Sequence, residues 1–231
     1  MEIHPSVWTK LVASILGVED LHHFAYYDHV VAASIAFIIC VIIALRTKTK
    51  ISMVPSHFQQ VVELVMEGIL GMLNENMGAR GRRYIPIVGT LAFFIFVGNL
   101  LGLIPTFSSS TSNFNTTVAC AVIVFIYYNF EGVRENGFGY LKHFLGPILF
   151  IAPLMIVIEI ISHLARPFSL SVRLFFNISG EHIVAGIIYG MLPVLVPIPL
   201  MALGLFAAVL QTFIFVILTT LYLTSATEHE H

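Results

Sequence analysis

The residues best suited to chemistry in this sequence fall in one stretch, from Glu159 to His182, within a strongly apolar region. At about 100° per residue, a helix over this stretch would place most of its polar residues on one face. That face comprises Glu159, Ser162, His163, Arg166, Ser169, Arg173, Asn177, Gly180 and Glu181. Leu170 is an apolar exception on it, and His182 points sideways, about 100° from Glu181. We therefore expect a helix with an apolar back and a polar, ionisable front.

The ionisable residues of the stretch from Glu159 to His182 are of two kinds. The guanidinium of Arg173 stays protonated at physiological pH, so it can attract a carboxylate or repel a cation but cannot relay protons. The second kind can gain and lose protons, and comprises Glu159, His163, Glu181 and His182. A fixed positive charge with titratable groups about 12–20 Å along the axis on either side predicts a barrier between two proton paths.

Salt bridging inside the protein is the alternative interpretation of this stretch, with Glu159 paired to His163 or Arg166 and Glu181 paired to Arg173. A charged side chain at bilayer depth costs about 2.5–3.5 kcal/mol, so these groups are expected to face protein or water rather than lipid. Of the two interpretations we favour the ion path.

Composition is typical of a membrane protein with several spans. The chain has 231 residues, of which 58% are hydrophobic and only 10% charged, and its mean hydropathy is +0.92. No basic cluster suggests a nucleic-acid partner, and no phosphate-binding or HExxH motif indicates ATP hydrolysis or a catalytic metal. The histidines from His22 to His29 fit no zinc spacing, and the two cysteines, Cys40 and Cys120, both lie in apolar runs. We expect no catalytic site of its own, no cofactor and no bound metal.

The elements that would position the polar face are helices. A first apolar span, residues 29–46, ends in the basic sequence RTKTK. Basic residues mark the cytoplasmic end of a span, so residues 1–28 are expected to form an outer segment. Residues 55–78 carry apolar positions at helical spacing opposite Gln and Glu, which predicts an amphipathic helix on the inner membrane surface.

Further spans are predicted at 84–105 and 117–130, joined by a polar outer loop. A helix over 145–190 would reach roughly 70 Å, more than twice the hydrocarbon core of about 30 Å. This stretch forms either two spans or one strongly tilted helix, and the polar face on both sides of Pro167 favours the single helix. The last span, 200–224, has Gln211 as its one strongly polar interior residue and leaves the C-terminus in the cytoplasm.

The predicted fold class is therefore an all-α membrane protein. It forms a single membrane domain, residues 1–231, with about five transmembrane helices and one amphipathic surface helix. No internal repeat is visible in the sequence, which weakens a transporter built from inverted halves.

Three segments together resemble the a subunit of F-type ATP synthase. They are RPFSLSVRLFFNISGEH on the polar helix, LQTFIFVILTTLYL in the last span and GNLLGLIPTFSSSTSNFNTT in and after the second span. The resemblance covers essentially the whole chain. The motif RLFxN on a long polar-faced helix, paired with a Gln in the final span, is specific, whereas each piece alone is weak.

The resemblance implies a multi-pass stator protein of a bacterial-type plasma (inner) membrane. Its two long, tilted helices would lie against a rotating ring of c subunits, in a complex with b-type peripheral stalk subunits and the remainder of the ATP synthase. Arg173 would meet the ring carboxylates one at a time, with Gln211 as its neighbour. Asn177 and the acidic or His position after it would line a half-channel from the outer face. Glu159 and Ser162 would line a half-channel to the inner face.

Two positions depart from the family pattern. Many relatives have Glu nine residues after the arginine, where this chain has His182, with Glu181 one position earlier. Some relatives have His or Glu seven residues before the Gln, where this chain has Gly204. The outer proton-handling group is therefore Glu181 or His182, and the helical arithmetic favours Glu181.

Two other functions compete with this one. A self-contained ion channel or secondary transporter would use the polar face to line its own pore and would conduct ions without a ring. A b-type haem protein would use His163 and His182, but these lie 19 residues apart on one helix, roughly 28 Å, whereas haem needs two histidines at similar depth on facing helices.

Overall fold

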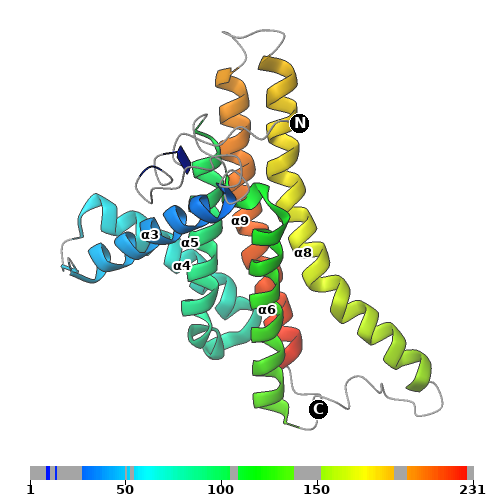
Figure 1. The fold of residues 1–231 in the computed structure, drawn as a ribbon. Coiled ribbons are helices and arrows are strands. Elements are labelled where there is room, and N and C mark those ends of the chain that lie inside the picture. The colour runs from blue at the N-terminus through cyan, green and yellow to red at the C-terminus, as the bar shows by residue number, and fades with distance from the viewer. Residues whose placement is uncertain are drawn as a thin grey trace.

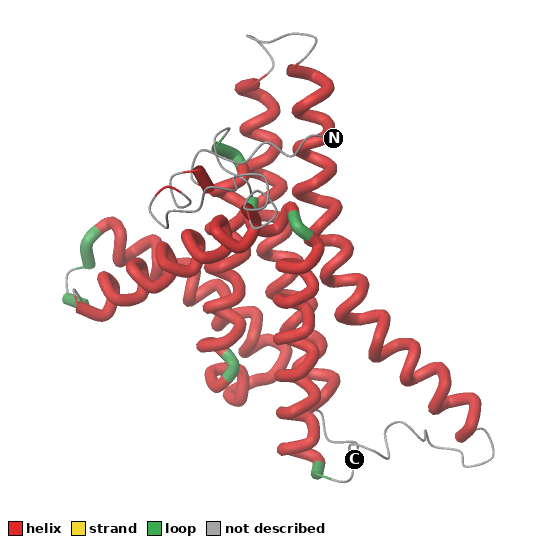
Figure 2. The backbone as a smooth tube through the Cα atoms, viewed as in Figure 1, coloured by secondary structure: helices red, strands yellow, loops and turns green. Residues whose placement is uncertain are grey.

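The computed structural model describes residues 9–10, 14, 28–49, 51–52, 55–104, 109–137, 152–189 and 197–227, with the backbone alone at 152, 182, 185–189 and 197–198. Within these ranges every regular element is a helix and no strand occurs (Figure 2). Five helices contain a stretch long and apolar enough to cross a membrane. They are Asp28–Thr49 (α3), Ile85–Gly102 (α5), Phe114–Asn136 (α6), Ala152–Tyr189 (α8) and Pro197–Thr227 (α9). The predicted all-α membrane fold is confirmed.

Some predictions fall outside the described residues. They concern most of the outer segment 1–28, including His22 and His23, the first residues of the 145–190 stretch, the turn before α9 and the tail after residue 227.

Helix α3 and the amphipathic helix α4 (His57–Met77) form an arm to one side of the other helices (Figure 1). Ala36, which is fully buried, lets α3 approach Val97 and Leu101 of α5 closely. Helix α4 begins at Ser56, whose side chain accepts a hydrogen bond from the backbone N–H of Gln59 at 3.4 Å. It ends at Gly78, whose φ of 61° is unfavourable for residues with a Cβ atom.

Two short 3₁₀ helices join the central helices. The first, η1 (Gly78–Arg83), leads from α4 into α5, and its Gly81 lies so close to α4 that a Cβ atom there would sit 2.7 Å from the carbonyl of Leu73. The second, η2 (Ser110–Ser112), precedes α6 and is held to α5 because the Thr111 hydroxyl donates to Asn99 Oδ1 at 2.6 Å. The described part of the polar loop predicted after the second span, from Ser109 onward, is thus folded against it.

Helix α6 extends beyond both ends of the predicted span 117–130, because its charged end has ion-pair partners. Glu131, with a side chain only 4% exposed, pairs with Arg83 of η1 at 3.0 Å. Glu135 pairs with Arg83 at 3.1 Å and with Arg80 at 3.6 Å. One residue further, the Asn136 side chain donates to the carbonyl of Ala226 in α9 at 3.0 Å. These contacts join η1, α6 and α9 at one end of the molecule.

Helix α8 is continuous over 38 residues and passes through Pro167 without a break. Of the two interpretations of the 145–190 stretch, the single helix is correct over the described part. At 1.5 Å per residue α8 is about 57 Å long, and the 31 residues of α9 reach about 46 Å. The two run side by side at one end and diverge at the other (Figure 1).

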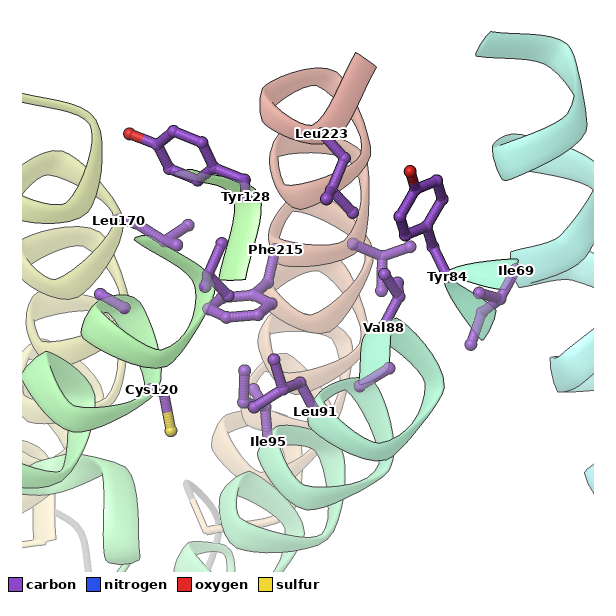
Figure 3. Close-up of a cluster of buried hydrophobic side chains, with 14 of the residues drawn as sticks. Ile69, Tyr84, Val88, Leu91, Ile95, Cys120, Tyr128, Leu170, Phe215 and Leu223 are labelled. Carbon is purple, nitrogen blue, oxygen red and sulfur yellow. The ribbon is translucent and has the colours of Figure 1, made fainter. Parts of the chain in front are cut away.

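The core lies where α4, α5, α6, α8 and α9 meet (Figure 3). Its largest buried side chains include Tyr84, Ile95, Tyr128, Leu170, Leu174, Phe215 and Leu223, each 1% exposed or less. The face of α4 that carries Ile69 and Leu73 packs into this core, so α4 is anchored to the bundle. Helix α8 joins the same core through Leu170 and Leu174.

Candidate ion path

Helix α8 packs on the bundle through one row of side chains. Leu170, Leu174 and Ile178, spaced four residues apart, are 1%, 0% and 3% exposed. Leu170, the apolar exception on the predicted polar face, is thus the first residue of the packing row. Leu164 and Phe168, on the predicted apolar back, are 60% and 64% exposed and lie on the outer surface. The polar face consequently runs along the margin between the bundle and the surface.

The centre of this margin is Arg173. Its side chain is exposed, as is that of Ser169 one turn earlier. Among the described residues no carboxylate forms an ion pair with Arg173. The salt bridge to Glu181, expected under internal pairing, is therefore not formed. Arg173 presents a fixed positive charge on the open face of α8.

One turn beyond Arg173, the polar face contacts α9. The side-chain amide of Asn177 donates to Gln211 Oε1 and to the carbonyl of Ala207, each at 3.4 Å. Gln211 is only 2% exposed, and its Nε2 has no hydrogen-bond partner within the described part of the chain. The resemblance implied Gln211 as the neighbour of Arg173, whereas the hydrogen bond that the structure describes joins Gln211 to Asn177, one turn further along α8.

The Glu181 side chain lies against Gly204 of α9. A Cβ atom built on Gly204 would collide with Glu181 Oε1 and with Leu103, the residue that follows α5. Because Gly204 has no side chain, the Glu181 carboxylate can occupy this space. Nearby on α8, the Ser179 hydroxyl donates to the carbonyl of Ser112 in η2 at 3.4 Å. The half of α8 after Arg173 thus meets polar groups of the loop before α6.

The half of α8 before Arg173 carries a second polar cluster. Glu159 Oε1 lies 3.2 Å from Nδ1 of His163, which is 7% exposed. The His163 ring packs against the buried Tyr128 of α6, with ring centroids 6.0 Å apart. One turn further, the Arg166 guanidinium lies 5.5 Å from the ring centroid of Tyr222 in α9. Internal salt bridging predicted His163 or Arg166 as the partner of Glu159, and the contact with His163 is formed.

Sequence reasoning missed the aromatic members of this second cluster. Tyr128 and Tyr222, whose ring centroids are 6.0 Å apart, connect α6 and α9 beneath the α8 cluster. Both lie in apolar spans where an aromatic residue is ordinary, so neither residue gave a signal in the sequence. Ser162, a predicted path residue, is half-buried on α8 between Glu159 and His163 of the second cluster.

His182 lies on α8, but its side chain is outside the described part, so its role stays a prediction. In the described ranges no group of three or more His, Cys, Asp or Glu side chains could hold a metal ion. The arrangement provides two polar clusters, after and before Arg173, with the exposed arginine between them.

Comparison with known proteins places the whole chain in one family. The family model described as ATP synthase A chain matches residues 29–224. ATP synthase subunit a of Sulfurihydrogenibium sp. is 45% identical over 205 residues, which cover 88% of this chain and 99% of the relative. ATP synthase subunit a of Geobacter sulfurreducens is 42% identical over 230 residues, 99% of this chain and 100% of the relative.

A third relative, ATP synthase subunit a 1 of Syntrophotalea carbinolica, is 44% identical over 99% of both chains. The residues matched by the family model begin in α3 and end in α9. The chain belongs to the ATP synthase subunit a family.

Proposed function

We propose that this chain is the proton-translocating stator subunit of a bacterial-type ATP synthase. It forms two offset half-channels that reach the carboxylates of a rotating c-subunit ring, and Arg173 separates them. The chain has no catalytic site of its own and works as a multi-pass inner-membrane component of the complex, held by b-type peripheral stalk subunits. Its N-terminus lies outside and its C-terminus in the cytoplasm, as the basic residues after α3 favour.

The observation that carries this proposal is that the Arg173 side chain is exposed and unpaired among the described residues. A charged side chain on the open face of a spanning helix is costly in lipid, and this one has no ion-pair partner among the described residues. A carboxylate on a partner helix would neutralise it. Because the charge is permanent, the partner carboxylate is held deprotonated while it is next to Arg173 and must take up or release its proton elsewhere.

The two polar clusters supply those two places. On the outer side a proton passes Glu181, His182 and Asn177 and neutralises a ring carboxylate, which can then enter lipid. On the inner side the carboxylate releases its proton near Glu159, Ser162 and His163. Glu159 and Arg173 are 14 residues apart, about 21 Å along the helix, so no hydrogen bond joins the two paths directly. Each elementary charge that crosses the membrane contributes about 2.3 kcal/mol per 100 mV, so several crossings must be coupled to one ATP.

The test is ATP-driven acidification of inverted membrane vesicles, together with their passive proton leak. Arg173→Ala is expected to reduce pumping to below about a tenth of wild type while the complex still assembles. Arg82→Ala is the matched control, because Arg82 is an exposed arginine in η1 without an ion pair in the described part of the chain. Normal pumping by Arg173→Ala would contradict the proposal.

The alternative function is a self-contained ion channel or secondary transporter. It would need the polar face to line an enclosed pore, whereas Arg173 and Ser169 are exposed on the outer surface of the chain. The open position of the central charge favours a path completed by a partner.

A further inference from the structure

A polar pocket lies where the end of α3 meets the start of α4. Its volume is about 330 Å³, and it is lined by Arg46, Thr47, Ser56, Phe58 and Gln59. Figure 1 shows these two helix ends at the tip of the arm, on the side away from α8. The pocket is therefore separate from the candidate ion path.

The one charged side chain among the lining residues of the pocket is that of Arg46, and the Glu63 carboxylate that accepts from the Gln59 amide is not part of the lining. Arg46 is exposed, and no described carboxylate pairs with it. The N-terminus of the 21-residue helix α4 opens at the same place, and its first turn contains no acidic residue. A helix N-terminus carries about half a positive charge and several unbonded N–H groups. The arginine and the helix end together favour an anion.

The side chain of Gln59 provides a second, independent indication of a ligand. It is 5% exposed, and its Nε2 donates to Glu63 Oε1 at 2.7 Å and to the carbonyl of Ser52 at 3.4 Å. Its Oε1 accepts no hydrogen bond from the described residues, although a buried carbonyl oxygen normally has a donor. The amide is thus fixed by its nitrogen, and its oxygen, which is buried in the wall of the pocket, lacks a donor among the described residues.

The position of the pocket along α3 corresponds to the headgroup region of a membrane. The 22 residues of α3 span about 33 Å, close to the hydrocarbon thickness, so its ends lie near the two interfaces. The pocket has an apolar border at the surface, since Phe58, which lines it, is 46% exposed and Leu45, next to Arg46 in α3, is 56% exposed. A polar, positive pocket bordered by exposed apolar side chains suits a lipid better than a water-soluble anion.

We propose that this pocket binds the headgroup of an anionic phospholipid that carries a glycerol hydroxyl, the chemistry of phosphatidylglycerol. The phosphate lies between Arg46 and the N-terminus of α4, and a hydroxyl of the glycerol donates to Gln59 Oε1. An ethanolamine headgroup could also donate, but its ammonium would lie close to the Arg46 guanidinium and be repelled. A choline headgroup has no donor for Gln59.

The test is native mass spectrometry of the intact, delipidated complex after addition of phosphatidylglycerol, phosphatidylethanolamine or phosphatidylcholine with identical acyl chains. The measured quantity is the amount of each lipid that stays on this chain when it is released from the complex. Wild type is expected to retain phosphatidylglycerol about fivefold more than phosphatidylcholine. Arg46→Gln removes this preference. Lys48→Gln keeps it, because Lys48 lies about 160° around α3 from Arg46 and does not line the pocket.

A second pair of variants tests the hydroxyl contact. Gln59→Leu is expected to lower phosphatidylglycerol retention severalfold, whereas Gln60→Leu, at an exposed position outside the pocket, leaves it unchanged. If Arg46→Gln complexes fail to assemble, this pair decides the outcome alone. Equal retention of the three lipids by wild type, or equal effects within either pair, would overturn the proposal. Displacement of the lipid by inorganic phosphate in about tenfold excess would assign the pocket to a free anion and overturn it as well.

Discussion

At the scale of single residues, Gly204 controls the position of the Glu181 carboxylate. Any side chain at residue 204 would collide with Glu181 Oε1, so Gly204→Ala is expected to displace the carboxylate and slow ATP-driven pumping severalfold. Alanine is the better helix former by about 1 kcal/mol, which offsets part of the cost of the second collision, with Leu103. The measurement is vesicle acidification, normalised to the amount of this chain.

Gly180→Ala is the control for this substitution. It makes the same chemical change beside Glu181, but a Cβ atom there would meet nothing within 4 Å. If Gly204→Ala pumped as fast as Gly180→Ala, the contact between Glu181 and Gly204 would have no part in transport.

Glu181 and His182 can be ranked by the same assay. Glu181 is turned toward α9 at Gly204, and His182 lies about 100° further around α8. Glu181→Gln is therefore expected to slow transport more than His182→Ala. The opposite order would assign the outer proton to His182.

At the scale of elements, the buried carboxylate of Glu131 joins η1 to α6. Its side chain is 4% exposed, and its two arginine partners are Arg83 at 3.0 Å and the more exposed Arg134 at 3.6 Å. Arg83→Gln leaves a buried charge with only the weaker partner and is expected to cost about 1–2 kcal/mol, allowing for the partial exposure of Arg83. The measurement is the temperature at which this chain leaves the purified complex.

Arg82→Gln is the matched variant for this prediction. Arg82 is the exposed neighbour of Arg83 in the same short helix and has no ion pair in the described part of the chain. Its substitution should leave the melting temperature unchanged. If both variants melted at the same temperature, the buried carboxylate of Glu131 would not need Arg83 as its partner.

Helical periodicity predicted the elements well but not which face of α8 packs. The polar face was read correctly, because charged residues at bilayer depth are rare and therefore informative. The row of packing residues was not predicted, because Leu170 and Phe168 are both large and apolar. Leu170 is nevertheless 1% exposed and Phe168 64% exposed. In a soluble protein an apolar residue indicates the core, but in a membrane it is equally stable against lipid. Likewise, the fold places Tyr128 next to the second polar cluster, and nothing in the sequence indicated this contact.

At the scale of the whole molecule, helix length constrains how the chain can sit in a bilayer. Helix α3 reaches about 33 Å from its 22 residues and can stand upright, whereas the 38 residues of α8 reach about 57 Å and must tilt strongly to stay within about 30 Å of hydrocarbon. Figure 1 shows that α3 crosses the direction of α8 and α9 at a steep angle, so α3 and α8 cannot both stand upright in one bilayer. A strongly tilted α8 would present the long row from Glu159 to Glu181 sideways, toward a partner.

Because this row of residues would face sideways toward a partner, we predict that the chain conducts protons only together with its ring. Glu159 and Glu181 lie about 33 Å apart along α8 with the exposed cation of Arg173 between them, and a continuous water path past that cation is unfavourable. Vesicles from cells that make every subunit except the ring protein should leak protons no faster than vesicles without this chain. Vesicles with the complete membrane sector, stripped of its catalytic head, should leak faster. The amount of this chain in each preparation is measured by immunoblot, so that loss of the protein is not mistaken for a closed path. A leak that scaled with the chain in the absence of the ring would mean that both halves of the path, and the connection between them, lie inside this one subunit.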